Sequence, residues 1–261
     1  RGLGDVYKRQ SDKFASIKAR IDLINDGSQS TASIMDKVYQ ASERSRGSYT
    51  DMLDSVAKLN MLAKDSFSSN DEAIAFVEQL NMQFKLSGAN VNEVNSAMTQ
   101  LTQAMAAGRL QGDEFNSVME NAPMLAQAIS QEMGVPIGQL KELGSEGAIT
   151  ADVIKSALFN SADETQAKFA QMPMTFQDVG QQLSNAMFQA FQPVMEELSS
   201  MTASEDFKTA IDGIGIAIQA MAIVATGAIA GLKVAFAGIK AVVSGVVLAV
   251  QNSANMWKGI F

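Results

Sequence analysis

The sequence of 261 residues contains no cysteine and no histidine. The absence of thiols excludes disulfides and cysteine nucleophiles. The absence of imidazole removes the commonest general base and most zinc sites. Only four prolines interrupt the chain, and aromatic residues make up 7% of it. Few segments are therefore barred from forming helices.

Positive charge is also scarce. The chain has 20 Lys and Arg against 28 Asp and Glu, a net charge of −8. Residues 11–210 carry 14 basic and 26 acidic side chains, a net of −12, and the last fifty residues are nearly uncharged. An acidic surface repels phosphate groups, so we expect no nucleic acid to bind through this acidic body.

Enzyme signatures are missing as well. The chain has no phosphate-binding Gly-Lys-Ser/Thr loop and no Gly-x-Ser-x-Gly nucleophile turn. Neighbouring acids on a helix point about 100° apart, which does not make the facing pair of a glycosidase. Such pairs occur at Asp71/Glu72, Asp113/Glu114, Asp163/Glu164, Glu196/Glu197 and Glu205/Asp206. We expect no enzyme, no cofactor and no metal site in this chain, and we interpret these acids as helix-start or solvated residues.

Apolar residues recur at helical spacing and nowhere alternate as in a strand, which predicts an all-α, multi-helix bundle with elongated helices. Asn70 is expected to cap a helix whose first turn holds Asp71 and Glu72. Gly88 and Asn90 mark a break before a helix over 91–107. The predicted apolar stripes are Ile17/Ile21/Ile24, Ile34/Val38/Ala41, Met52/Val56/Leu59/Leu62, Ile74/Val77/Leu80/Met82 and Val94/Met98/Leu101/Met105.

The run from Gly108 to Ile154 predicts four short helices separated by tight turns. Asp113 and Glu114 suit a first helical turn, and Pro123 suits an early helical position. Gly134 is a good left-handed terminator, and Thr150 is a good N-cap. We also expect Pro136 to open a short helix that Gly144 closes. The run therefore predicts a compact helical module of about fifty residues.

The same run resembles the N-terminal region of tail-length tape measure proteins of long-tailed bacteriophages. The resemblance preserves the order of three segments: residues 108–115, residues 122–129 and residues 133–154. The residues that carry it are Gly108, Arg109, Gly112, Asp113, Glu114, Phe115, Pro123, Gly134, Leu140, Gly147 and Thr150.

The resemblance implies a structural protein that sets tail length while tube subunits polymerise around it. It implies tail tube subunits, tail assembly chaperones and tail-tip or baseplate proteins as partners, and an oligomer in the tail. Such a protein is in the bacterial cytoplasm during assembly and then in the tail lumen. Hydrophobic segments of the family are thought to enter the host membrane during genome ejection.

Thr175 is expected to cap a longer helix that reaches about Ser199 and ends in a hinge over 199–204. Pro193 should kink this helix, because proline lacks an amide donor and clashes with the preceding turn. The predicted apolar face of the helix is Phe176, Val179, Leu183, Ala186, Met187, Ala190 and Phe191.

Residues 204–261 form a Gly/Ala-rich hydrophobic segment. Residues 213–232 carry no formal charge, which is enough helix to cross about 30 Å of hydrocarbon. Gly227 and Gly231 are four residues apart, and Gly231, Gly238 and Gly245 repeat every seven residues, as in helices that approach closely. The segment is either a membrane-competent helical hairpin or a buried, glycine-rich packing helix.

Four regions follow from these patterns. Residues 1–10 resemble a translated sequencing-library adapter and show no helical pattern, so we expect them not to be native. Residues 11–172 are the helical region, with its compact module at about 70–160. A kinked amphipathic helix and hinge follow over 175–203, and the hydrophobic region covers 204–261. We expect an internal fragment of a longer protein.

A second class of function remains open from the sequence. In a membrane-inserting helical toxin or effector, the acidic helical body would keep residues 213–250 soluble until a trigger released them. A ruler would continue downstream for hundreds of helical residues, whereas a toxin would end soon after a hydrophobic hairpin.

Overall fold

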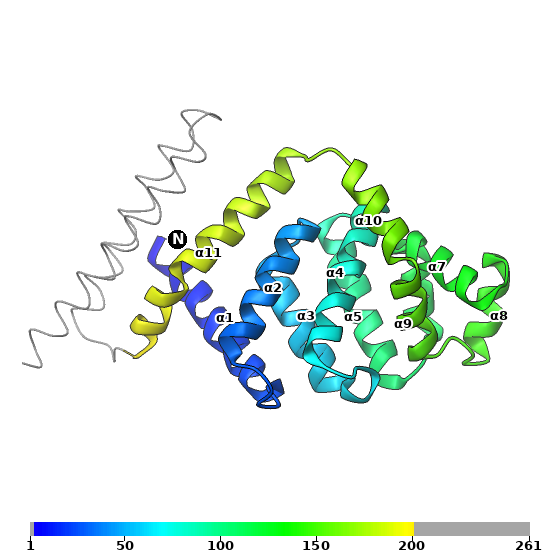
Figure 1. Cartoon of the computed structure of the whole chain (residues 1–261), viewed down its shortest axis with the longest axis horizontal. Coiled ribbons are helices and arrows are strands. Elements are labelled where there is room, and N and C mark those ends of the chain that lie inside the picture. Colours follow the sequence, from blue (N-terminus) through cyan, green and yellow to red (C-terminus); the bar gives the residue numbers. More distant parts are fainter. Residues whose placement is uncertain (1–2, 201–261) are drawn as a thin grey trace, which may run out of the picture. The chain divides into compact units, whose positions relative to one another are not determined.

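The computed structural model describes residues 3–200 (Figure 1). Within this range the chain forms eleven α-helices, two short 3₁₀ turns and no strand, so the all-α prediction is confirmed there. The helices are α1 Leu3–Ile24, α2 Thr31–Ser45, α3 Tyr49–Leu62, α4 Asn70–Leu86, α5 Val91–Ala107, α6 Gly112–Asn121, α7 Pro123–Met133, α8 Leu140–Ser145, α9 Ala151–Asn160, α10 Ala162–Gln171 and α11 Phe176–Ser200.

The chain divides into two compact units. Ile17–Asn185 forms one of them, which we call the body. Arg1–Ser16 and Ala186–Phe261 belong to the other. In that second unit the rings of Phe14 and Phe188 contact each other with centroids 5.3 Å apart. The four-region division drawn from the sequence stays a prediction.

Helix α4 is the centre of the body. It packs against α2, α3, α7, α9 and α10, and Figure 1 shows it between α2 and the pair α9 and α10. Phe76 on α4 is fully buried and meets Phe67 and Phe159 edge to face, with ring centroids 5.2 and 6.4 Å apart. The predicted stripe of α4 (Ile74, Val77, Leu80 and Met82) is buried, as expected.

The other faces of α4 are buried too, although they are polar. Glu78 accepts two hydrogen bonds from the Arg44 guanidinium, at 2.7 and 2.8 Å. The Asn81 amide donates to the carbonyl oxygen of Ser45 at 2.8 Å. Buried polar groups need partners, so these contacts fix α2 against α4. The predicted apolar stripe is therefore only one of the buried faces of α4.

Side-chain caps begin the helices where short polar residues precede an apolar run. Asn90 forms a full capping box with Glu93 at the start of α5, and the predicted bounds 91–107 are confirmed. Ser69, not Asn70, caps α4: its hydroxyl accepts from the Glu72 amide at 3.1 Å. The prediction of Asn70 was wrong by one residue, because Asn70 already has helical backbone.

Two further expectations fail at helix ends. Helix α1 begins at Leu3, so the absence of a helical pattern before residue 11 was wrong for residues 3–10. Once a turn of helix is nucleated, each added residue costs little, and only Gly4 disfavours the extension. Leu62, expected on the inner face of α3, is 59% exposed because it is the last residue of the helix.

None of the described helices is both long and apolar enough to cross a membrane. The uncharged stretch 213–232 and the glycines Gly227, Gly231, Gly238 and Gly245 lie outside the described residues.

Replacing Phe76 by Ala should test the central position of α4. The substitution removes a buried aromatic ring, and we expect the free energy of unfolding to fall by about 3–5 kcal/mol. Urea unfolding followed by circular dichroism measures this change. Leu62→Ala is the matched control and should change the free energy by less than about 0.5 kcal/mol, because the side chain is exposed. Equal losses in the two variants would contradict the assignment.

Candidate functional site

The two ends of the motif run are joined by backbone hydrogen bonds. The Leu110 amide donates to the carbonyl of Ile149 at 2.8 Å, and the Ala151 amide donates to the carbonyl of Gly108 at 2.9 Å. Arg109 and Thr150 thus form an isolated antiparallel bridge. This clasp (residues 108–110 and 149–151) closes α6, α7 and α8 into one loop of chain within the body.

Motif glycines occupy turns that other residues rarely adopt. Gly108, Gly112, Gly134 and Gly147 all have positive φ, between 58° and 78°. Gly108 and Gly134 end α5 and α7 in the left-handed conformation, as predicted for Gly134. A Cβ on Gly147 would lie 3.3 Å from Cδ of Arg109, so this glycine also makes room for the arginine side chain beside the clasp.

Gly144 has a different role from the predicted one. It does not close its helix: α8 runs through it to Ser145, and the left-handed turn falls at Gly147. Gly144 is buried, and a Cβ there would lie 3.0 Å from the Phe115 ring. Close packing of α6 on α8, rather than chain reversal, explains this glycine.

The remaining motif residues are structural as well. Pro123 is the first residue of α7, Leu140 is fully buried, and the Thr150 hydroxyl caps α9 by accepting from the Val153 amide. Asp113 and Glu114 lie in the first turn of α6, where acids favour the helix dipole. The structure thus brings the two ends of the motif together. Of its two acids in the first turn of α6, Asp113 is exposed and Glu114 is half-buried.

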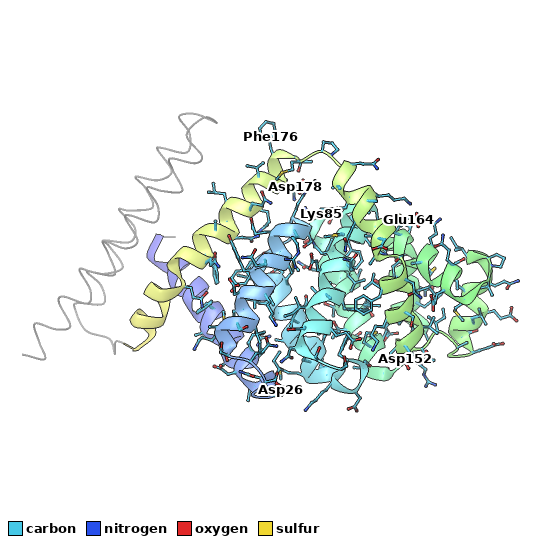
Figure 2. The ribbon with its side chains drawn as sticks, in the orientation of Figure 1. Asp26, Lys85, Asp152, Glu164, Phe176 and Asp178 are labelled. Carbon is cyan, nitrogen blue, oxygen red and sulfur yellow. The ribbon has the colours of Figure 1, made fainter. Side chains whose placement is uncertain are left out.

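A second cluster, which we call the latch, holds the first half of α11 to the other helices of the body. Asp178 accepts from Lys85 Nζ at 2.5 Å, and Arg46 Nη1 is 3.8 Å from its other carboxylate oxygen. Asp178 and Thr175 also cap each other: the Thr175 amide donates to the carboxylate, and the Asp178 amide donates to the hydroxyl. Figure 2 shows Lys85 and Asp178 side by side.

Asn185 is the other half of the latch. Its side-chain oxygen accepts from the Tyr49 amide at 2.9 Å, and its side-chain nitrogen donates to the carbonyl of Gly47 at 2.8 Å and to the Glu43 carboxylate at 3.1 Å. Asn185 is almost completely buried. The turn between α2 and α3 is therefore capped by a side chain from a distant helix.

The predicted apolar face of α11 is not the face that is buried in this half of the helix. The residues facing the body there are Asp178 and Asn185, both buried, whereas Phe176 is 91% exposed. Figure 2 shows the Phe176 ring directed away from the body. The stripe of apolar residues has the predicted helical spacing, but in this half of α11 it faces solvent. Helix α11 continues through Pro193 to Ser200, so the kink stays a prediction, and most of the proposed hinge lies outside the described residues.

Charge and burial set the pKa values in the latch. Burial by itself raises the pKa of Asp178, but the hydrogen bonds from Lys85 and Thr175 outweigh it and hold the pKa below the ordinary value of 3.8. Burial raises the pKa of Glu43, and the hydrogen bond from Asn185 only partly opposes this. The ion pair therefore contributes stability wherever Asp178 is charged.

A groove of about 410 Å³ adjoins the latch between α3, α5 and the start of α11. Met52, Met98 and Met172 line it together with the latch pair Lys85 and Asp178. Methionine side chains suit an adaptable apolar surface. The two cations that line it, Lys85 and Arg46, are paired with Asp178, and its methionines offer a packing surface.

The acidic pair Asp71 and Glu72 has basic partners on other helices. Asp71 pairs with Lys37 at 2.7 Å, and Glu72 pairs with Lys155 at 3.2 Å. Burial raises the pKa of Glu72, but its hydrogen bonds with Ser68 and Lys155 outweigh this effect and hold the pKa below its ordinary value. Among residues 3–200, no acidic side chains gather closely enough to hold a metal ion.

Sequence reasoning found one part of the latch, the predicted Thr175 cap of α11, which is confirmed by the hydrogen bond from the Asp178 amide, and it missed the rest. Thr175 and Asp178 are three residues apart, which is the spacing of a capping box, so this half carried a readable signal. Asn185 carried none, because its partners in the rest of the body lie 136 to 143 residues away in the chain, and only Gln181 is a neighbour on the same helix.

Comparison with known proteins adds one match. The family model described as tape measure protein matches residues 7–196, which is most of the chain. Neither the curated proteins nor the solved structures include a significant match.

Gly147→Ala should loosen the clasp. Alanine in a left-handed conformation costs about 1–2 kcal/mol, and its methyl group would press on Arg109. We expect the free energy of unfolding to fall by about that amount, measured by urea unfolding, with faster hydrogen exchange at the Leu110 and Ala151 amides. Gly138→Ala is the control, because nothing lies within 4 Å of its Cβ position and its φ is not positive. If both variants behave alike, the special role of Gly147 is wrong.

Asp178→Asn should weaken the latch above the carboxyl pKa and not below it. A folded-state pKa below 3.8 means that the contribution of Asp178 is present at neutral pH and is lost as pH falls through the folded-state value. We expect a loss of about 1–2 kcal/mol at pH 7, because a buried charge-assisted hydrogen bond is replaced. The difference should shrink toward pH 2 to 3 in urea titrations. Asp152→Asn, an exposed first-turn acid with the same charge change, should cost only a few tenths of a kcal/mol.

Proposed function

Because the chain belongs to the tape measure protein family, whose members are structural proteins of the phage tail, we propose that it sets tail length and scaffolds assembly of the tail tube. The observation that carries this proposal is the family match over residues 7–196. It favours the ruler over a membrane-inserting effector, since the match covers the acidic helical region on which the effector interpretation depended.

Helix geometry explains how such a chain measures length. An α-helix rises 1.5 Å per residue, so a helical segment inside the tube converts residue number into distance. Tube subunits then polymerise along it until the helical length is covered. Helix α11, with 25 residues, is the longest described helix and is suited to this task.

The body has a different part in this mechanism. Its helices α2 to α10 have between 6 and 17 residues each and fold back on one another, so they add little distance per residue. The body forms an end of the tape, where tail-tip or baseplate proteins and tail assembly chaperones dock. Its polar, acidic surface suits protein partners with basic surfaces.

Location changes with the stage of infection in this scheme. The chain is in the bacterial cytoplasm during assembly and in the tail lumen of the finished virion. Residues 213–232, which carry no formal charge, are long enough to enter the host membrane during genome ejection.

A lengthened α11 should give a longer tail. We would insert three further copies of residues 179–192 in tandem within α11 of the phage gene, because each copy is two heptads and keeps the helical register. The added residues, about 42 in all, should lengthen the tail by about 63 Å. Electron micrographs of purified virions give the mean tail length.

The control inserts the same residues at Gly27, in the exposed turn between α1 and α2 of the body. Tails of that phage should keep the parental length, because the insertion does not extend the ruler. Tails of unchanged length in the α11 phage, assembled in normal numbers, would refute the ruler role.

A further inference from the structure

The linker after α10 and the first half of α11 lie on the body without burying any apolar side chain. In this described stretch, residues 172–185, the only buried side chains are Asp178 and Asn185, and both are polar. We call the stretch the strap. Helix α4, by contrast, buries Phe76 and Leu80 completely. Burial of apolar surface is the main favourable term in folding, so the strap lacks the interaction that stabilises the rest of the body.

Polar contacts hold the strap in place instead. Lys85 donates to Asp178, and the Asn185 side chain exchanges hydrogen bonds with the Tyr49 amide and the Gly47 carbonyl. Each of these bonds replaces bonds to water, so its net contribution to stability is modest. The strap is therefore the part of the body whose attachment is easiest to reverse.

Arg46 ties the strap to a strained turn. With a φ of 55°, it is the one residue other than glycine with positive φ in the part of the chain that the structure describes. Glycine is the usual residue at such a helix end, because a Cβ is unfavourable there. The Arg46 guanidinium donates to the carbonyls of Met172 and Pro173 at 3.0 and 3.3 Å, lies 3.8 Å from Asp178 and stacks on the Phe169 ring at 4.6 Å. Three of these four contacts are with the strap, so docking of the strap offsets the strain.

We propose that the strap is a releasable element of the body, which lifts as one unit while α2 to α10 stay folded. Both partners of each broken bond then reach water, so no buried polar group is left unpaired. Release separates Asp178 from Lys85 and Arg46, and it frees the turn between α2 and α3 from α11. The opening is a property of the body alone and does not depend on whether the chain measures tail length.

Two amides in the first turn of α3 distinguish release of the strap from unfolding of the body. The Tyr49 amide donates to Asn185 in the strap, whereas the Met52 amide donates to the carbonyl of Ser48 within the body. We would follow hydrogen exchange of the full chain in a mild non-ionic detergent, resolved to single residues by mass spectrometry. After correction for intrinsic rates, we expect the Tyr49 amide to exchange at least about tenfold faster than the Met52 amide.

A matched pair of variants shows whether the strap moves as a unit. Lys85→Met removes an ion pair of the strap, and Lys155→Met removes the ion pair with Glu72 elsewhere in the body. The two lysine side chains are 22% and 21% exposed. We expect Lys85→Met to speed exchange at Tyr49 by about tenfold, because the lost bond is charge-assisted and lies in the strap. Lys155→Met should leave the Tyr49 rate within about twofold, because its ion pair stays intact when the strap lifts. Urea unfolding should show that both variants destabilise the body.

Three results would overturn the proposal. Equal exchange at Tyr49 and Met52 in the unchanged chain would mean that the strap opens only with the body. A fast Tyr49 amide that does not respond to Lys85→Met would report fraying at the start of α3. Equal acceleration at Tyr49 by both variants would assign its exchange to global unfolding. Tail length, measured in virions, is unaffected by any of these results, so the proposed function would stand or fall separately.

Discussion

The need to satisfy polar groups inside a small helical body governs much of this structure. Helix α4 is surrounded on nearly every side, so its Glu78 and Asn81 must find partners within the protein. They find them in Arg44 and in the backbone of Ser45, at the end of α2. A buried polar group that loses its partner costs more than the bond itself contributes, which makes the placement of α2 on α4 specific.

The turn between α2 and α3 contacts both α4 and α11. Gly47 approaches so closely that a Cβ there would lie 2.7 Å from the Asn81 side chain and 2.8 Å from the sulfur of Met52. Its carbonyl accepts the hydrogen bond from Asn185. The missing side chain of Gly47 thus lets α4 reach the backbone between α2 and α3, and the same short turn also receives the Asn185 side chain of α11.

Docking through polar groups has a consequence for a structural protein of the tail. A helix that attached through an apolar face would have no apolar surface left for a partner. Helix α11 attaches through Asp178 and Asn185, so its apolar stripe remains available. The motif module, by contrast, uses its glycines and its clasp internally. The residues that identify the family by sequence therefore maintain the fold of the body.

The sequence by itself determined the helices. Caps, terminating glycines and apolar spacing are local features, so the bounds of α5, the start of α7 at Pro123 and the cap of α9 at Thr150 could all be read from neighbouring residues. Local reading also explains the small errors at Asn70 and Gly144, where two nearby candidates compete for one helix end. The family resemblance came from the same local run and is confirmed by the match over residues 7–196.

Only the tertiary structure decided which faces are buried. An apolar stripe shows which side of a helix could be buried, but the burial of α4 on its polar side and the exposure of Phe176 depend on partners distant in sequence. Asn185 shows the reason: its hydrogen bonds join residues more than 130 positions apart, and no spacing rule within one helix contains that information. Leaving such buried groups without partners would cost more free energy than leaving one apolar stripe exposed, so α11 docks through its polar side.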